Sequence, residues 1–322
     1  MTAYILRRLV QCVILIILVS MLVFFLIRLM PGDPLLLLFT LDDIATMTGG
    51  FQEALEALRH EHGLDRPIAV QYLSWLWDVV RGNFGRSIVR GFDIASEVQR
   101  RLQVTLFLSF IAFVISNILG VFFGVISAIR RGKFLDTIVT SVANIGVTAP
   151  SFLIAILVIY IFGFRLRWFP IFGYQLPWAG DFSRSMRQMV MPIFVMCLGP
   201  TASICRQTRS SVLEELNKDH VRTAWAKGMR EKSVIFRHVL KNALMPIISL
   251  QGGMIRGLFG GSAIVENIFV IPGIGQLIVS SMLASDYTVI QAVTIMITLI
   301  AVLSNLLVDL LYGWVDPRIQ YQ

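Results

Sequence analysis

The chain has 322 residues, of which 56% are hydrophobic and only 15% are charged. An average soluble domain carries about 25% charged residues, so the composition excludes an ordinary soluble domain. Glycine (24), proline (11) and cysteine (3) occur in ordinary numbers, which excludes collagen-like, disordered and disulfide-rich chains. The apolar residues form blocks of about 20 or more, the length that crosses a bilayer as a helix. The sequence therefore predicts an all-α membrane protein with several spans.

The net charge is +8, from 28 Lys and Arg against 20 Asp and Glu. In a membrane protein such an excess usually lies in cytoplasmic loops. No basic patch is interleaved with aromatic residues in the way that grips single-stranded nucleic acid, so we expect no nucleic-acid partner. Cys12, Cys197 and Cys205 lie within or at the end of apolar blocks, which is typical of small buried residues rather than disulfides or metal ligands.

The first apolar block, residues 9–27, follows Arg7 and Arg8. Its 19 residues exceed the apolar region of a signal peptide, and no small-x-small cleavage site precedes Met30. We therefore expect a cytoplasmic N-terminus over 1–8 and a first transmembrane helix over 9–29. Five further spans are predicted at 104–129, 137–164, 188–205, 245–265 and 289–312, which makes six. The fourth is the shortest and contains Pro192 and Pro200.

The connection 30–103 opens with the turn-rich Pro31-Gly32-Asp33-Pro34. Residues 55–58 and 70–80 read as amphipathic helices, so 30–103 is predicted to fold as an external cap between the first two spans. His60-Glu61-His62 is the only histidine cluster, and its alternate spacing would need strand geometry to hold a metal. We interpret it as a solvated charged run and expect no metal site.

The distribution of Lys and Arg predicts the orientation. Loop 206–244 holds nine Lys and Arg, loop 266–288 holds none, and all five lysines fall on one side of the six predicted spans. Both termini and the loops at 130–136 and 206–244 are therefore expected in the cytoplasm. The loop that carries Arg165, Arg167, Arg184 and Arg187 opposes this rule.

Signatures of catalysis are missing from the sequence. It contains no G-x-x-x-x-G-K-[ST] phosphate loop, no G-x-S-x-G, no H-E-x-x-H and no C-x-x-C. His220 and His238 lie among basic residues, and we interpret them as surface groups. We therefore expect no catalytic residue, no metal ligand and no cofactor bound by this chain. A membrane-embedded enzyme would need clustered polar groups within the spans, and none is present.

Glycines mark close helix contacts in two spans. Gly120 and Gly124 form a G-x-x-x-G, which allows the backbone of another helix to approach closely. In the fifth span, the glycines and one arginine form two adjacent rows, Gly253, Gly257, Gly261 and Gly252, Arg256, Gly260. Such a face suits either helix packing or the lining of a narrow passage.

Arg256 lies about 15 Å along the fifth predicted span. A charge at this depth costs about 2.5–3.5 kcal/mol on insertion scales, so we expect its side chain to point into the bundle or a wet cavity. It either lines the pathway or pairs with a buried acid or carbonyl. Asn305 and Asp309, four residues apart, are predicted to form hydrogen bonds between helices rather than to relay protons.

Loop 206–244 is predicted to fold rather than to hang as a tether. Ser211-Val-Leu-Glu214 resembles a capping box, and Gly228 stands where a glycine would end a helix in a left-handed turn. A second helical stretch follows over 231–240. The predicted product is a cytoplasmic loop with two helices.

The same loop carries a family signature. The membrane permeases of bacterial binding-protein-dependent ABC importers have E-A-A-x-x-x-G and, nine residues later, I-x-L-P. Here Arg222-Thr223-Ala224 stands for E-A-A, Gly228 matches, and His238-Val239-Leu240-Lys241 replaces I-x-L-P, with Asn242 to Pro246 reading N-A-L-x-P. Shorter matches run along the chain: Tyr4 to Arg8, Pro31 to Pro34, Gly63 to Pro67, Gln71-Tyr72, Asn83 to Ser87, Glu266 to Phe269, Pro272 to Gly275, Asp286-Tyr287 and Asp316 to Arg318. In their order and spacing, the matches resemble the first permease subunit of the dipeptide/oligopeptide/nickel group.

The resemblance implies a core at 104–322 that forms a translocation pathway for short peptides in the bacterial cytoplasmic (inner) membrane. It implies a second permease subunit in a heterodimer, two cytoplasmic ATPases that carry ATP and Mg, and an external substrate-binding protein. The residues implied in ATPase docking are Arg222, Thr223, Ala224, Lys227, Gly228, His238 and Leu240. A nickel-chelate or glutathione importer shares these motifs, while an ATP-independent channel or carrier would not need a folded two-helix loop.

Overall fold

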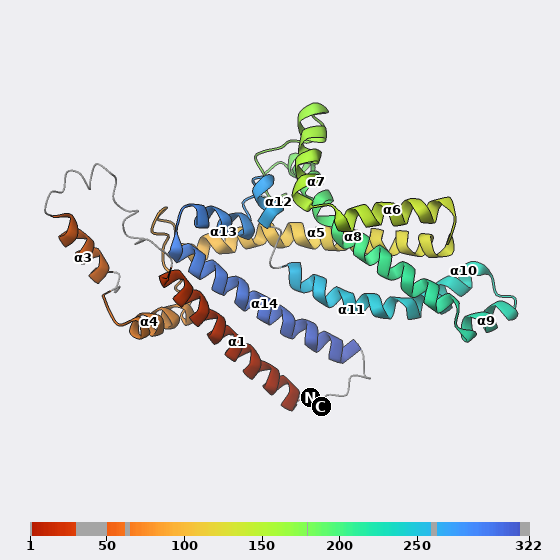
Figure 1. Ribbon diagram of the computed structural model, residues 1–322, viewed down its shortest axis with the longest axis horizontal. Helices are drawn as coiled ribbons and strands as arrows, with labels where there is room; N and C mark the ends of the chain where they lie inside the picture. Colours follow the sequence, from red (N-terminus) through yellow and green to blue (C-terminus); the bar gives the residue numbers. More distant parts are fainter. Residues whose placement is uncertain (1, 30–49, 62–64, 179, 259–262, 316–322) are drawn as a thin grey trace. The chain divides into compact units, whose positions relative to one another are not determined.

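The computed structural model describes residues 2–29, 50–61, 65–178, 180–258 and 263–315 (Figure 1). Within these ranges the chain is mostly helical, and its only β-structure is an isolated bridge between Arg86 and Asp93. The predicted all-α class is therefore confirmed. The chain divides into two compact units, one built from residues up to 103 together with 276–306, and one built mainly from 104–275.

The first unit contains the N-terminal helices and much of the C-terminal one. Its helices are α1 (Thr2–Arg28), α3 (Phe51–Glu61), α4 (Ile68–Val80), the start of α5 (Ile94–Ile129), most of α13 (Ile274–Leu283) and the larger part of α14 (Tyr287–Val315). The two helices predicted in the 30–103 connection are present as α3 and α4. The short apolar helix α13 lies in a stretch that the sequence left as a loop.

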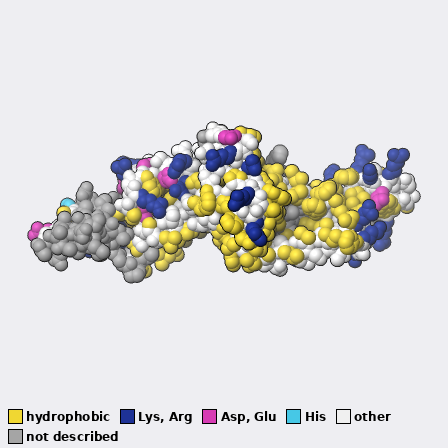
Figure 2. Space-filling view, turned by 90° about the horizontal axis from the view of Figure 1, so that it is seen from above, with side chains coloured by type: hydrophobic (Ala, Val, Ile, Leu, Met, Phe, Trp, Pro, Cys, Tyr) yellow, Lys and Arg dark blue, Asp and Glu magenta, His cyan; other side chains and the backbone are white. Residues whose placement is uncertain are grey.

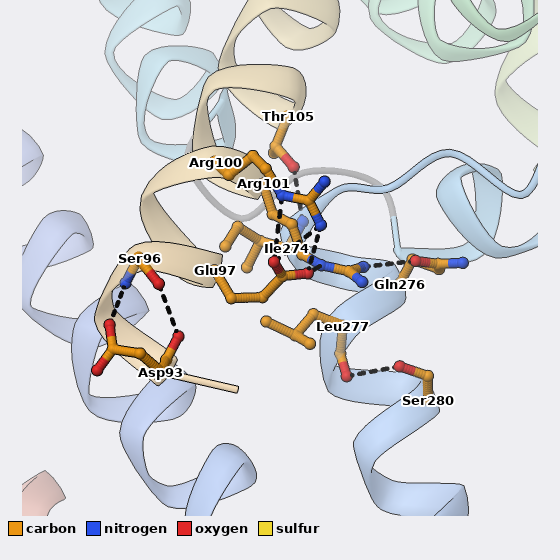
Figure 3. A network of polar contacts seen from close by, with 10 residues as sticks. All are labelled: Asp93, Ser96, Glu97, Arg100, Arg101, Thr105, Ile274, Gln276, Leu277 and Ser280. Atoms are coloured by element: carbon orange, nitrogen blue, oxygen red, sulfur yellow. Dashed lines mark hydrogen bonds and ion pairs between the residues drawn. The ribbon is translucent and has the colours of Figure 1, made fainter. Parts of the chain in front are cut away.

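Polar contacts between residues far apart in the sequence help to hold this unit together. The hydroxyls of Ser20 on α1 and Tyr72 on α4 lie 2.9 Å apart, buried beside the Phe24 ring. At the start of α5, the guanidinium of Arg101 donates to the carboxylate of Glu97 and, at 2.6 Å, to Gln276 of α13 (Figure 3). Arg101 thus ties α5 to α13 across 175 residues of sequence.

The second unit is arranged around α8. It contains the rest of α5, then α6 (Phe134–Thr148), α7 (Ser151–Val158), the π-helix η2 (Ile159–Arg165), α8 (Phe182–Leu216), α9 (Asp219–Ala226), α10 (Glu231–Ser233), the π-helix η3 (Val234–Val239), α11 (Leu240–Leu258) and α12 (Ala263–Ile268). Helices α6, α7, α11 and α12 all contact α8, so α8 is the helix on which this unit is assembled (Figure 1).

Small residues let α5 lie directly against α8. A Cβ added at Gly120 would lie 2.6 Å from the Cβ of Ile204, and one added at Gly124 would lie 2.6 Å from the Cβ of Thr208. Real side chains do not approach so closely, so both positions require glycine. The close helix approach predicted from this G-x-x-x-G is confirmed.

Several helices are long and apolar enough to cross a membrane. Among the described residues these are α1 from Leu6 onward, α5, α8 and α14 as far as Leu306, and α6 with α7 and η2 add a fifth span if that bent pair crosses as one. The exposed aliphatic and aromatic side chains along α1 and α5 suit contact with lipid. The chain is therefore a multi-pass membrane protein. Helix α11, Leu240–Leu258, which covers most of the predicted fifth span 245–265, is not among these candidates in the described part of the chain.

The predicted third span, 137–164, is not one continuous helix. It breaks at Ala149 and Pro150, and the two halves are bent by 106°. The proline ring disfavours helical backbone at the preceding residue, and Ala149 accordingly adopts ψ of 130°. Pro192 and Pro200 stay inside α8 without ending it, and several helices contact α8, the setting in which membrane helices tolerate proline.

Two helix boundaries predicted around loop 206–244 are wrong. Ser211 does not cap a new helix, because α8 continues without a break to Leu216 and buries Ser211. No Gly or Pro lies between Cys205 and Leu216, so nothing in the chain stops the helix at the membrane surface. The second loop helix does not end near residue 240 either, because α10, η3 and α11 follow one another directly from Glu231 to Leu258.

Candidate functional site

Between α8 and α11 the chain folds into a small knob, residues 217–239, made of α9, α10 and η3. Gly228 ends the first helix with φ of +73°, and its N–H donates to the carbonyl of Trp225. The next N–H, of Met229, donates to the carbonyl of Ala224. The left-handed glycine predicted at this position is confirmed, and it turns the chain back toward η3.

The knob has an apolar interior that is continuous with the membrane helices. Val221 and Val234 are completely buried, and they pack with Val212 of α8, Ala128 of α5 and Ala243 of α11. The cluster therefore fixes the knob to the helices α5, α8 and α11 at once. Its orientation follows theirs, as expected for a rigid element rather than a tether.

Ala224 belongs to this interior. It is 5% exposed and packs in the same cluster. Because its methyl group is covered by the chain's own residues, it cannot supply the direct contact with an ATPase that the family signature implies. Its small size instead allows α9 to lie close to the ends of α5 and α8.

Glu215, at the end of α8, fixes the position of α9. The residue is 4% exposed, and its carboxylate accepts hydrogen bonds from Lys218 at 2.6 Å and from Asn242 of α11 at 2.9 Å, with Nε2 of His220 lying 3.1 Å from the same carboxylate. The carboxylate raises the pKa of Lys218. A buried carboxylate needs such partners, so Glu215 joins the end of α8 to the starts of α9 and α11. No sequence pattern indicates Glu215, apart from the N-A-L-x-P motif that supplies its partner Asn242.

A second buried carboxylate lies beside the knob. Asp136, at the start of α6, is 5% exposed and receives two hydrogen bonds from the guanidinium of Arg209 on α8, at 2.8 and 2.9 Å. The hydroxyl of Ser127 and the backbone N–H of Gly132 also donate to Asp136. This bidentate pair clamps the short loop between α5 and α6 against α8. Residues 73 positions apart form it, so sequence spacing could not indicate it.

The outer surface of the knob is basic and partly apolar. Arg222, Thr223, Lys227 and Gly228, all implied in docking, are exposed. His238 and Leu240 are half-buried. Two aromatic residues missed by the sequence analysis are also on this surface: Trp225 is 43% exposed and Phe236 is 67% exposed.

Lys and Arg side chains gather over the end of this unit that carries α9 and α10 (Figure 2). Aromatic side chains surrounded by basic ones are typical of a surface that binds another protein.

The glycine row of the fifth predicted span is described only in part. Gly253 is exposed, and a Cβ added there would meet nothing within 4 Å. Gly252, Arg256 and Gly257 lie on α11, but their side-chain surroundings are outside the described residues, as are Gly260 and Gly261 altogether. At least at Gly253, the row does not pack against α11's neighbours within this unit.

The structure describes the other polar residues singled out in the sequence only in part. Oδ1 of Asn305 is buried without a hydrogen-bond partner among the described residues, and the side chain of Asp309 lies outside them. His60 lies 3.8 Å from Asp65, with both side chains well exposed, and His62 is not described. Over the described ranges, no three His, Cys, Asp or Glu residues come together as metal ligands would, and the three cysteines are free.

The family models and the known proteins that this chain resembles all describe membrane components of transport systems. The family model described as "Binding-protein-dependent transport system inner membrane component" matches residues 120–321, and the model of the N-terminal part of such membrane components matches 1–109. The oligopeptide transport system permease protein AppB of Bacillus subtilis (strain 168) is 37% identical over 323 residues, covering 100% of both chains. A protein of Brucella abortus (strain 2308), provisionally named a peptide transport system permease, is 37% identical over 321 residues, again with 100% of both chains covered.

A solved structure shares the fold. In an inward-facing form of the MetNI methionine ABC transporter, one chain superposes with a TM-score of 0.53 at 18% identity, covering 68% of this chain and 96% of that one. The two family models together cover nearly the whole sequence. The chain therefore belongs to the binding-protein-dependent transport system inner membrane components, the permease subunits of ABC importers.

Proposed function

We propose that this chain forms one half of the translocation pathway of an ABC importer for short peptides. The observation that carries the cargo assignment is the similarity, along the whole length of both chains, to AppB of B. subtilis, which is named for oligopeptide transport. The Brucella relative, named for peptide transport, is as similar over the same extent. The full length matters here, because similarity only in the region that faces the ATPases would support importer function but would say nothing about the cargo.

The knob is the element that docks the ATPases in this proposal. Its exposed Trp225 and Phe236 supply apolar contact, and Arg222 and Lys227 supply charge around them. Nucleotide and Mg belong to the partner subunits. When the ATPases close on ATP, the knob moves with them, and Glu215 and the Asp136–Arg209 pair pass that movement to α8, α6 and α11. An unfolded loop could not transmit it.

A second permease subunit completes the pathway. The open surroundings of Gly253 support this, because no described residue lies within 4 Å of a Cβ added there, which leaves room for another backbone. In the assembled pair, the glycine row of α11 faces either the partner or the passage. Arg256 lies on the same helix, and we propose that it takes part in the passage because a charge within the membrane needs water or a partner.

The proposed topology has six spans with both termini in the cytoplasm. The spans are α1, α5, α6 with its bent continuation, α8, α11 and α14. The basic loops at 130–133 and 206–244 support the orientation, and the packing of α11 along α8 supports its inclusion as a span. The external substrate-binding protein delivers cargo on the opposite side, where residues 30–103 lie.

Uptake by cells that carry the complete operon tests the cargo. A strain deleted for this gene is complemented with the wild-type gene, and uptake of a labelled dipeptide, a labelled pentapeptide, glutathione and a nickel chelate is measured. We expect peptide uptake that depends on the gene. Gene-dependent uptake of glutathione or the nickel chelate alone would reject the peptide assignment, and uptake that persists without the ATPases would reject the importer itself.

A further inference from the structure

A cavity of about 550 Å³ lies in the second unit, in the segment that joins η2 to α8. Its volume falls within the range of ligand pockets, about 300–1,000 Å³. The wall carries the guanidinium-bearing residues Arg167, Arg184 and Arg187 and the aromatic residues Trp168 and Phe172. These arginines are three of the four that oppose the charge bias of the loops.

The cavity has an excess of positive charge. Asp181 is the one acidic residue in its wall, so three arginines against one aspartate leave a formal charge of +2. The Asp181 carboxylate is already engaged, because it accepts the backbone N–H groups of Ser183 and Arg184 as the N-cap of α8. Among the described residues, no carboxylate lies within ion-pair distance of the three guanidiniums. The cavity therefore suits an anion from outside the chain.

The frame of the cavity is fixed before any ligand binds. Arg187 donates to the carbonyl of Trp168 at 2.8 Å, and the side-chain amide of Gln188 donates to the carbonyls of Phe172 and Gly173 at 3.0 and 2.8 Å. These bonds hold the 168–173 segment on the first turns of α8. Arg167 has φ of +53°, a backbone conformation that a residue with a Cβ adopts rarely and that is found often at ligand sites.

The position of the cavity along the chain indicates the source of the anion. One candidate span ends at Arg165, and the next begins at Phe182, so the segment between them lies where hydrocarbon gives way to headgroups. Aromatic side chains that are 55–67% exposed surround it, namely Phe164, Trp168, Phe172, Trp178 and Phe182. Exposed aromatic rings of this kind mark the membrane interface. In Figure 2, Lys and Arg side chains lie among hydrophobic ones over the part that carries α7.

We propose that this cavity binds the phosphate group of an anionic phospholipid, with its acyl chains lying along the exposed aromatic residues. Guanidinium groups bind phosphate oxygens in a forked, charge-assisted geometry. The lipid phosphate also accounts for arginines on the side of the membrane where basic residues are depleted, because it neutralises them there. The proposal does not depend on the cargo. With the proposed topology, which puts the segment between η2 and α8 on the external side, the lipid belongs to the outer leaflet of the membrane.

Native mass spectrometry of the full chain in mild detergent tests the proposal with three probes. These are phosphatidylglycerol, a diacylglycerol with the same acyl chains, and inorganic phosphate. We expect one phosphatidylglycerol to remain bound under conditions that strip the diacylglycerol. Equal retention of both lipids would overturn the proposal, because the phosphate would then contribute nothing. Displacement of the lipid by millimolar inorganic phosphate would also overturn it, in favour of a small-anion site.

A matched pair of variants locates the site. The double substitution Arg167→Gln and Arg184→Gln removes two guanidiniums that make no side-chain hydrogen bond within the described structure, and it should weaken phosphatidylglycerol binding about tenfold or more. Arg165→Gln, an exposed arginine of the same segment outside the cavity wall, should bind as the wild type does. Equal weakening in both would mean diffuse surface charge. Should the double variant fold poorly, the comparison of the two lipids on the wild-type chain still decides the question.

Discussion

At Gly228 a single backbone angle determines whether the chain can turn from α9 back toward η3. Its φ of +73° costs a residue with a Cβ roughly 1–2 kcal/mol, although nothing lies within 4 Å of the position itself. Gly228→Val therefore strains the turn and places a branched side chain on the docking surface. We expect normal membrane insertion, strongly reduced transport and ATP hydrolysis that no longer responds to loaded binding protein. Reconstituted transport and ATPase assays measure both.

Gly82 provides the control. It has φ of +80°, and nothing lies within 4 Å of it, so Gly82→Val carries the same backbone penalty at a site far along the chain from the knob. Co-purification with the ATPases should persist in Gly82→Val and fall in Gly228→Val. An equal fall in both would show that backbone strain, rather than docking, explains the loss.

The negative charge of Glu215 stabilises the position of α9 in the knob. Glu215→Gln keeps the shape but removes the negative charge that Lys218 and His220 contact. Because hydrogen bonds to charged groups contribute about 1.5–3 kcal/mol where buried, and the Lys218 and His220 side chains are about half exposed, we expect a local destabilisation of about 1–2 kcal/mol. Hydrogen exchange of residues 217–228 should speed up roughly tenfold, while exchange of the α8 amides before 210 stays unchanged.

The exposed neighbour Glu214 tests whether that effect belongs to the site. Glu214→Gln removes an equal charge from the solvent-facing side of the same helix turn. Exchange in the knob should match the wild type in this variant. Faster exchange in Glu214→Gln would mean that net charge near the helix end, and not the Glu215 contacts, stabilises α9.

At the scale of helices, glycines with different surroundings should respond in opposite directions. Gly124→Ala places a Cβ 2.6 Å from the Thr208 side chain and 2.7 Å from the Cys205 carbonyl, so α5 and α8 must move apart at a cost of about 1–3 kcal/mol. Gly253→Ala meets open space and removes a helix-destabilising glycine. Thermal unfolding of the isolated chain in detergent should show a lower midpoint for Gly124→Ala and an unchanged or higher one for Gly253→Ala.

In the assembled transporter the result for α11 should reverse. A larger side chain, Gly253→Leu, should leave the isolated chain stable but reduce pairing with the second permease or transport through the pair. Normal assembly and transport in Gly253→Leu would show that α11 faces lipid at this point, and the proposed partner face would be wrong.

Apolar blocks predicted the helices well because burial in lipid is a local property of the sequence. The α1, α5, α8 and α14 helices and the Gly228 turn follow from composition and from single residues. The break at Pro150 and the unbroken passage of α8 through Pro192 and Pro200 could not be distinguished in advance, since each depends on what packs against the helix. The Asp136–Arg209 pair was also missed, because only the fold brings these residues together.

For the whole molecule, the proposed topology predicts which surfaces meet the outside of the cell. Lys133→Cys and Gln99→Cys both introduce a thiol at an exposed position near opposite ends of α5. A membrane-impermeant maleimide should label Gln99→Cys in intact cells and Lys133→Cys only after the cells are opened. The native cysteines Cys197 and Cys205 are buried, and the wild-type chain measures the background. Labelling of Lys133→Cys in intact cells would invert the topology.

Because α8 is unbroken, its 35 residues form a single rod about 52 Å long. A rod of this length turns a tilt of about 5° at the Glu215 end into a displacement of about 4–5 Å at the Asp181 end, where the arginine-lined cavity begins. The length of α8 thus sets how far its Asp181 end moves for a given tilt, because no loop interrupts the helix and absorbs the movement. Pro192 and Pro200 each remove a backbone hydrogen bond, so α8 would bend most easily at these two positions. Bending there would determine how much of the displacement reaches the far side of the membrane.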